Sequence, residues 1–284
     1  MMRYKPLAVG IALCSVVCMF FVGQTSVSSE TPLPEKIVSL VPAVTEELYL
    51  LRAQDRIVGV TIYCQRPPEA QRKKKVGTVV DVNVEKILEL QPDLVVASEL
   101  TDPRQLAKLR GLGVRVELVS QAINYDKLCA NFVKLARLVG REEDALRITS
   151  EARSELQRLA EQVKACPTPR VFVQIGADPL FTSGKRTLIN AMIETAGGMN
   201  IADDITGTSM YSREKVIRGN PDIILIATMG VAEEHEQTVW MRYKTINAVK
   251  QRRIHMIDPY SVGSPTPVSY IDTVTRLARI FCGI

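Results

Sequence analysis

The sequence has few of the residues, and none of the motifs, that common enzyme classes require. It contains only two histidines, His235 and His255, so a histidine-rich transition-metal site cannot be assembled. It has no G-x-G-x-x-G or G-x-S-x-G pattern, which leaves dinucleotide-binding and α/β-hydrolase sites unsupported. The segment 183–187 lacks the first glycine of a phosphate-binding loop, and Arg186 stands where serine or threonine is required. No motif in the sequence pairs a nucleophile with a general base. Together with the missing cofactor and metal motifs, this leads us to expect that the protein is not an enzyme and has no resident cofactor or metal site.

Charge and aromatic content are also modest. The net charge of the 284 residues is +5, aromatic residues make up 5%, and none of them interrupts the basic run 72–75. Nucleic-acid sites combine a basic patch with stacking aromatics, so we interpret this run as a solvated turn and expect no nucleic-acid partner. The acidic run 233–236 is likewise interpreted as a solvated helix end rather than a metal site.

The first thirty residues have the pattern of an export signal. Two basic residues precede an apolar run over residues 7–22, and small polar residues follow it. This run is shorter than the roughly 20 residues of a membrane-spanning helix. We therefore predict that residues 1–29 are a signal peptide and that the mature chain is exported. Lipid attachment at Cys14 or Cys18 is the less favoured alternative, because neither cysteine follows the small residue that such a site requires.

Export leaves four cysteines in the mature chain: Cys64, Cys129, Cys166 and Cys282. An oxidising compartment permits two disulfides in three pairings, and a buried free thiol is the alternative for each cysteine. The absence of C-x-x-C spacing argues against structural zinc. The pairing stays open.

One segment occurs twice. Residues 83–93 run into the apolar stretch 94–97, and residues 212–222 run into the apolar stretch 223–227, with Glu214 placed 129 positions after Glu85. Each copy predicts a short helix, a Pro-Asp stop and a buried parallel strand. A single recurrence half a chain away indicates two similar lobes, and a cleft between lobes is a typical ligand site.

Predicted strands and helices alternate along the mature chain. The expected strands are Lys36–Val41, Arg56–Val60, Val114–Val119, Arg170–Ile175 and Arg253–Ile257, and the expected helices are Ala43–Leu51, Pro103–Gly111, Thr187–Ala196, Ile246–Lys250 and a final helix to Ile280. This order predicts an α/β fold with two similar lobes and mainly parallel sheets.

Apolar residues at helical spacing predict two further helices, Asp126–Val139 and Arg141–Val163. The second is long enough to run along both lobes, although an ordinary amphipathic helix within one domain fits the pattern equally. The expected organisation is an N-terminal lobe over 30–122, linking helices over 123–166 and a C-terminal lobe over 167–284.

Five aromatic residues are expected in loops or at element edges, mostly just after strands: Tyr63, Phe181, Tyr211, Trp240 and Tyr260. Ligands of open α/β sheets bind at the carboxyl ends of strands, where aromatic faces suit a planar or bulky ligand. Each residue alone is more often a packing residue, but together they are candidate ligand-binding residues. Tyr63 and Phe181, one from each lobe, are expected to face one another across the cleft.

Several short motifs follow one another along the mature chain: Ser39–Glu46, Pro67–Ala70, Asn83–Glu85, Leu90–Val95, Pro179–Lys185, Gly197–Ile201, Ser212–Glu214 and Ser264–Pro265. In this order and spacing they resemble the periplasmic substrate-binding proteins of vitamin B12, ferric-siderophore and haem importers. The resemblance covers essentially the whole mature chain. It implies class III lobes joined by one long helix, and a protein that delivers a corrinoid or iron complex to the permease of an ABC importer.

The resemblance also implies residue roles. By motif, Glu85 and Glu214 are the glutamates that dock onto permease arginines, and they are the pair that the repeat aligns. A surface glutamate favoured by the helix dipole is the ordinary alternative. An exported tetrapyrrole-modifying enzyme on the same scaffold is a less favoured function.

The chain departs from the vitamin B12 binders of the family at several positions. Val79 replaces a ligand-stacking tryptophan, Thr266 replaces a ligand-contacting arginine, and Ala196 replaces a disulfide cysteine, whereas Tyr63 and Phe181 match pocket aromatics. Despite these departures, the matching aromatics make a corrinoid the first expectation for the ligand, followed by ferric siderophore and haem.

Overall fold

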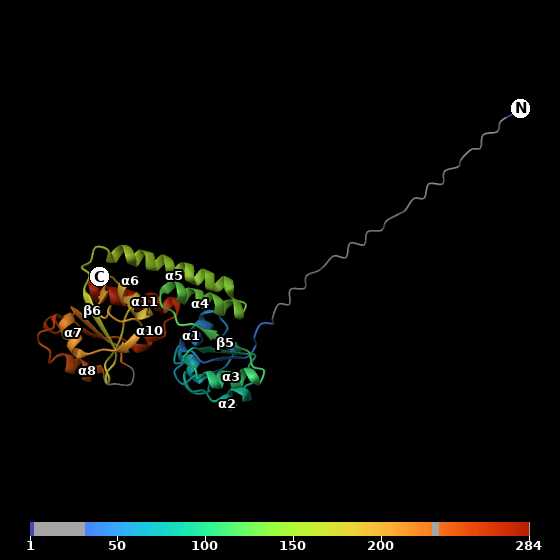
Figure 1. Cartoon of the computed structure of the whole chain (residues 1–284), viewed down its shortest axis with the longest axis horizontal. Coiled ribbons are helices and arrows are strands. Elements are labelled where there is room, and N and C mark those ends of the chain that lie inside the picture. The colour runs from blue at the N-terminus through green and yellow to red at the C-terminus, as the bar shows by residue number, and fades with distance from the viewer. Residues whose placement is uncertain (3–31, 229–232, 284) are drawn as a thin grey trace. The chain divides into compact units, whose positions relative to one another are not determined.

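The computed structural model describes residues 1–2, 32–228 and 233–283, and residues from Leu33 onward form one compact unit (Figure 1). The predicted signal peptide, with Cys14 and Cys18, lies outside the described residues apart from its first two positions. Among the helices that are described, none combines the length and the apolar character needed to cross a membrane.

The N-terminal lobe is built on a parallel five-stranded sheet in the order β3-β2-β1-β4-β5. Its strands are β1 (Ile37–Ser39), β2 (Ile57–Val60), β3 (Lys74–Lys75), β4 (Leu94–Ser98) and β5 (Val116–Val119), and its helices are α1 (Pro42–Leu50), α2 (Val84–Glu89) and α3 (Pro103–Gly111). The central strands β1 and β4 are buried except at the last residue of β4, which explains why they consist of aliphatic residues up to the serine that ends each strand.

The C-terminal lobe has a mixed sheet in the order β11-β10-β6-β7-β9, with β8 paired to β6. The strands are β6 (Arg170–Gly176), β7 (Phe181–Ser183), β8 (Met199–Asn200), β9 (Thr208–Met210), β10 (Ile223–Ile226) and β11 (Ile254–Met256). The helices are α6 (Leu188–Thr195), α7 (Arg213–Gly219), α8 (Glu233–Trp240), α9 (Asn247–Lys250), α10 (Pro259–Gly263) and α11 (Pro267–Cys282). Only β7 and β9 are antiparallel to their neighbours, so the prediction of an α/β fold with mainly parallel sheets is confirmed.

The duplicated segment has the same role in both lobes. In each copy the aspartate of the Pro-Asp stop accepts a backbone hydrogen bond from the start of a central strand. Asp93 Oδ2 accepts from Lys36 N at 2.8 Å, just before β1, and Asp222 Oδ2 accepts from Arg170 N at 2.9 Å, at the start of β6. The Pro-Asp pair therefore joins each repeat to the middle of its sheet.

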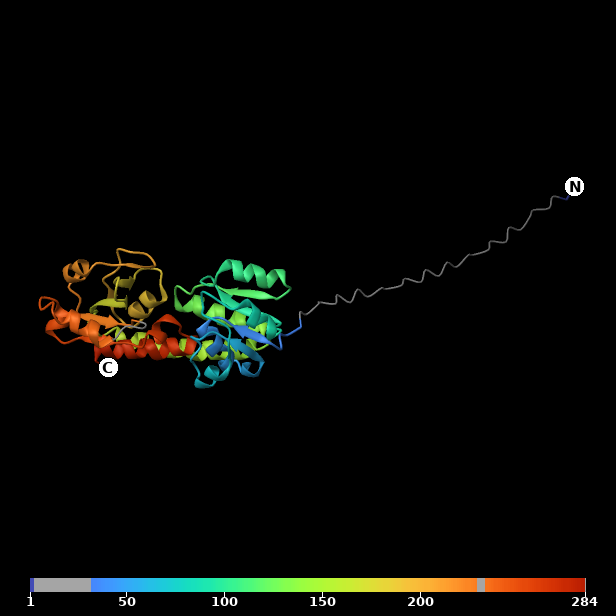
Figure 2. The same cartoon turned by 90° about the horizontal axis from the view of Figure 1, so that it is seen from below.

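Two helices, α4 (Tyr125–Leu138) and α5 (Glu142–Val163), connect the lobes (Figure 2). Helix α5 has 22 residues and would be about 33 Å long at 1.5 Å per residue. Its Ala145 belongs to the apolar core of the N-terminal lobe, whereas Ala152 and Leu159 belong to the core of the C-terminal lobe. The helix thus serves both lobes, and the single-domain alternative is wrong.

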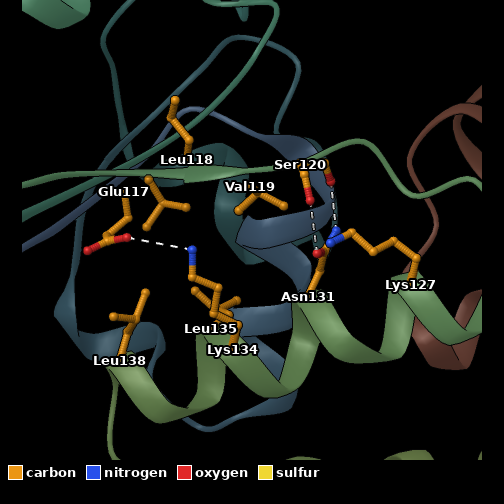
Figure 3. A pocket seen from close by; sticks show the side chains of 10 residues that line it. Glu117, Leu118, Val119, Ser120, Lys127, Asn131, Lys134, Leu135 and Leu138 are labelled. Carbon is orange, nitrogen blue, oxygen red and sulfur yellow. Dashed lines mark hydrogen bonds and ion pairs between the residues drawn. The ribbon is translucent and has the colours of Figure 1, made fainter.

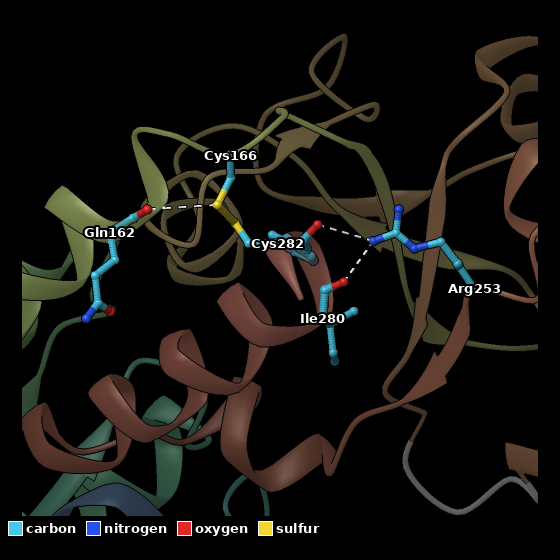
Figure 4. Close-up of a disulfide and its surroundings, with 6 residues drawn as sticks. Gln162, Cys166, Arg253, Ile280 and Cys282 are labelled. Atoms are coloured by element: carbon cyan, nitrogen blue, oxygen red, sulfur yellow. Dashed lines mark hydrogen bonds between the residues drawn. A yellow bond between two sulfur atoms is a disulfide. The ribbon is translucent and has the colours of Figure 1, made fainter. Parts of the chain in front are cut away.

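One disulfide closes the C-terminal lobe. Cys166, just after α5, is bonded to Cys282, the last residue of α11 (Figure 4). Cys64 and Cys129 are free and buried. One of the two disulfides that the compartment would permit is therefore formed.

Candidate interlobe ligand site

The two lobes contact one another through loops that follow the carboxyl ends of β2 and β11. Arg66, in the loop after β2, forms an ion pair with Asp258, which lies just after β11. The guanidinium carbon of Arg66 also lies 4.4 Å from the centre of the Tyr260 ring. Ligands of parallel sheets bind at the carboxyl ends of the strands, so this interlobe contact marks the candidate site.

A buried polar network fixes the N-terminal side of this site. Cys64 has no exposed surface, and its Sγ lies 3.1 Å from Thr45 Oγ1 and 3.2 Å from Thr61 Oγ1. Thr45 Oγ1 in turn lies 2.8 Å from Ser39 Oγ at the end of β1. With Cys64 held below the loop, the neighbouring Tyr63 is left 47% exposed. The hydrogen-bond network therefore fixes the loop in a conformation that leaves the Tyr63 ring exposed.

A carboxyl group and a phenol lie close to this contact. Burial raises the pKa of Glu46, on α1, and the nearby Arg66 partly offsets this effect. Its Oε2 atom is buried without a hydrogen-bond partner among the described residues. Burial also raises the pKa of Tyr260, and the charge of Glu46 adds to that rise. No group of three histidine, cysteine, aspartate or glutamate side chains suited to a metal ion occurs in the described part of the chain.

Phe181 lies at the corresponding edge of the C-terminal lobe. It is half-buried at the start of β7 and pairs with Gly176, at the carboxyl end of β6. Strands β6, β10 and β11 are parallel neighbours, so Phe181 and Asp258 belong to the same edge of the sheet. Phe181 therefore lies at the carboxyl-end edge of the sheet, and among the described contacts none joins it to Tyr63.

The motif around Phe181 has a structural explanation. Thr182 Oγ1 donates to the carbonyl of Val173 at 2.6 Å, and Asn200 Nδ2 donates to the carbonyl of Ser183 at 2.8 Å. A Cβ atom at Gly184 would lie 2.4 Å from the carbonyl oxygen of Ile205, so only glycine fits there. The residues after Phe181 thus hold β7 in place.

Trp240 does not belong to the site, and its prediction as a ligand-binding residue is wrong. Its side chain has no exposed surface, it packs edge-on against Phe172, and its Nε1 donates to Gln174 Oε1 at 2.6 Å. A ligand cannot reach this ring. Trp240 was expected at an element edge, but as the last residue of α8 it is buried in the lobe core.

Tyr211 is grouped with this core and not with Tyr63. Its ring stacks on Phe172 with 6.0 Å between centroids, and its hydroxyl donates to Asp204 Oδ1 at 3.0 Å. It borders an open depression of about 300 Å³ beside α7, together with Lys215 and Arg218. Of the five predicted aromatics, Tyr260 contacts Arg66, and Tyr63 lies in the same loop as Arg66.

Glu236 corrects the interpretation of the acidic run 233–236. It is buried, and its Oε2 accepts from Gln174 Nε2 at 2.7 Å and from Arg213 Nη2 at 2.9 Å. Burial raises the pKa of Glu236, but these two donors outweigh burial and hold the pKa below its usual value. The residue is thus a charged core group paired beneath α7.

The two predicted docking residues occupy matching exposed positions. Glu85 lies in the first turn of α2 and Glu214 in the first turn of α7, with side chains 71% and 82% exposed. Lys108 Nζ lies 3.0 Å from Glu85, and a hydrogen bond from this lysine lowers the pKa of the carboxyl. Arg218 lies 3.4 Å from Glu214. Both carboxylates are accessible to a partner.

A small cavity of about 100 Å³ lies within the N-terminal lobe, between β5 and α4 (Figure 3). Val119 and Leu135 form part of its apolar lining, and Lys134 and Glu117 approach to 3.8 Å at its rim. It is lined entirely by N-terminal-lobe residues and α4, so it is separate from the interlobe contact.

These features define a two-lobed ligand-binding protein whose lobes are connected by one long helix. Residues 37–260 match the periplasmic binding protein family, and the chain belongs to this family. An ABC transporter substrate-binding lipoprotein of Bacillus subtilis, YvrC, is 33% identical, with 87% of this chain and 79% of that protein aligned.

Two solved structures extend the comparison. The periplasmic vitamin B12-binding protein BtuF of Vibrio cholerae is 28% identical with a TM-score of 0.76, covering 88% of this chain and 98% of that one. The periplasmic haem-binding protein RhuT of Roseiflexus sp. RS-1 is 26% identical with a TM-score of 0.79, covering 87% and 97%. The predicted family is therefore confirmed.

Proposed function

We propose that this protein is the periplasmic substrate-binding component of an ABC importer, exported by its N-terminal signal peptide. It captures a corrinoid or an iron complex, such as a ferric siderophore or haem, between its lobes and is not itself an enzyme. The observation that carries this proposal is the meeting of the β2 and β11 loops within a periplasmic binding protein fold. A corrinoid is the first candidate because vitamin B12-binding proteins are among the similar sequences as well as the similar structures.

The proposed ligand contacts come from both lobes. Tyr63 offers an exposed ring from the N-terminal lobe, and Tyr260 and Phe181 lie at the facing edge of the C-terminal lobe. Aromatic faces cover a planar, partly apolar ligand without burying unpaired charge beneath it. Tyr211, which borders a different depression, is at most a peripheral contact.

The ligand can be identified directly. Protein purified from its host should carry a visible spectrum of a corrinoid, haem or ferric complex, and titration with cyanocobalamin, haem and a ferric siderophore should give saturable binding of one of them. Failure of all three classes to bind would contradict the proposal. Turnover of a tetrapyrrole by the purified protein would instead favour an enzyme.

Glu85 and Glu214 are the proposed contacts with the permease. Exposed carboxylates on matching helices contribute orientation and encounter rate more than affinity for the small ligand. Replacing both with alanine should leave ligand affinity nearly unchanged and reduce complex formation with the permease. Matched replacement of the exposed Glu155 and Glu161, on α5, should have no effect, and transport equal to wild type in the Glu85/Glu214 variant would remove the docking role.

A further inference from the structure

The guanidinium of Arg66, at the interlobe contact, uses only a small part of its hydrogen-bonding capacity. Within the described residues, the guanidinium donates one hydrogen bond, from Nη2 to Asp258, and the ring of Tyr260 supports it from one face. A guanidinium has five N–H donors arranged for bidentate binding of carboxylate or phosphate. Arg66 therefore keeps unused donors at the place where the proposed ligand enters, and its side chain is 35% exposed.

Asp258 does not depend on Arg66 for its position. Its Oδ1 accepts from Tyr260 N at 3.0 Å and caps α10, whereas its Oδ2 pairs with Arg66. The aspartate side chain is 43% exposed, and exposed ion pairs are weak. Exchange of Asp258 for another anion would thus leave the helix cap in place.

The surrounding charges make Arg66 important for any anion that binds here. Glu46, on α1, lies within electrostatic range of Arg66, and Asp258, the cap of α10, pairs with it, so two acidic groups adjoin the guanidinium. Without Arg66, these carboxyls would repel an anionic ligand. With Arg66, the same place offers a planar donor edge stacked on an aromatic ring.

We propose that Arg66 determines ligand specificity by binding an anionic oxygen group of the ligand, a carboxylate or a phosphodiester, and that Asp258 competes for the same guanidinium. This inference rests on the proposed function, since it requires a ligand between the lobes. It gives the two residues opposite effects: Arg66 favours the anionic ligand and Asp258 disfavours it.

Paired probes that differ in the anion test this assignment. Cyanocobalamin carries a phosphodiester that dicyanocobinamide lacks, and haem carries two carboxylates that are masked in its dimethyl ester. Arg66→Gln should weaken binding of the anionic member of the relevant pair about tenfold or more, as expected for a charge-assisted hydrogen bond, and change the uncharged member less than about twofold. Asp258→Asn, which can still cap α10, should strengthen binding of the anionic member about threefold or more.

The outcomes separate the inference from the function beneath it. If Arg66→Gln weakens both members of a pair equally, Arg66 only ties the lobes together and the inference is wrong. It is also wrong if Asp258→Asn weakens anion binding in a variant whose thermal unfolding matches that of the wild type. If the wild-type protein binds neither pair and no ferric siderophore, the proposed function itself fails, and the role of Arg66 fails with it.

Discussion

Removing the disulfide between Cys166 and Cys282 should destabilise the C-terminal lobe strongly. The two cysteines are 116 residues apart, and the bond encloses almost the whole lobe, from β6 to α11. In the chain-entropy description, closing a loop of that length stabilises the folded state by about 5 kcal/mol at 25 °C. In a protein of this size, about 1 kcal/mol corresponds to about 2–4 °C in Tm. We therefore expect a fall in Tm of about 10–20 °C.

The native contacts at the end of α11 indicate that this effect acts through the unfolded chain. Arg253 Nη2 donates to the carbonyls of Ile280 at 2.8 Å and Phe281 at 3.3 Å, so the helix end stays anchored without the disulfide (Figure 4). The Cys166→Ser/Cys282→Ser variant should accordingly keep its far-ultraviolet circular dichroism spectrum and its ligand affinity at 25 °C.

Thermal unfolding with and without a reducing agent supplies the control. Reduced wild-type protein should unfold at the temperature of the double variant, and reductant should not change the variant, because Cys64 and Cys129 are free thiols already. A double variant that unfolds within about 2 °C of the oxidised wild type would refute the entropic argument.

Three further substitutions distinguish packing from ligand contact. Trp240→Phe leaves Gln174 Oε1 without its indole donor, so the free energy of unfolding should fall by about 1–3 kcal/mol in urea while ligand affinity stays constant. Gly184→Ala places a Cβ atom 2.4 Å from the carbonyl oxygen of Ile205, and urea unfolding should show a loss of at least about 1–3 kcal/mol. Phe181→Ala should weaken ligand binding by about 1–3 kcal/mol in calorimetric titration, and unchanged affinity for every ligand class would assign Phe181 to packing.

The fold could be predicted because its main signals are local. The helix predicted at Pro103–Gly111 has the same bounds as α3, and a proline at its start and Asp102 as its cap explain the agreement. The duplicated Pro-Asp stop predicted two parallel strands because a proline ends a helix wherever it occurs. Strands β7 and β9 were missed, since each has only three residues and is held by pairing with a distant strand.

The burial of individual polar and aromatic residues could not be predicted in the same way. Glu236 follows two other acidic residues and looks solvated, yet it is buried because Arg213 and Gln174, from distant parts of the chain, both donate to it. Trp240 is buried by the same group, since it also bonds to Gln174. Such burial depends on which elements pack together in the folded chain. The residues next to Glu236 in the sequence therefore do not indicate which side chains will pair with it.

The same reason explains why Arg66 was overlooked while Tyr63 and Tyr260 were selected. An aromatic residue after a strand suggests a ligand contact from the sequence alone. An arginine in a loop does not, because most such arginines are solvated surface residues. The partner, Asp258, is 192 residues away and in the other lobe. In the structure Asp258 also precedes Pro259 and caps α10. An ion pair between the lobes can be identified only when the positions of both sheets are known. The Arg66–Asp258 pair therefore adds a charged contact to a site that the sequence predicted from aromatic residues alone.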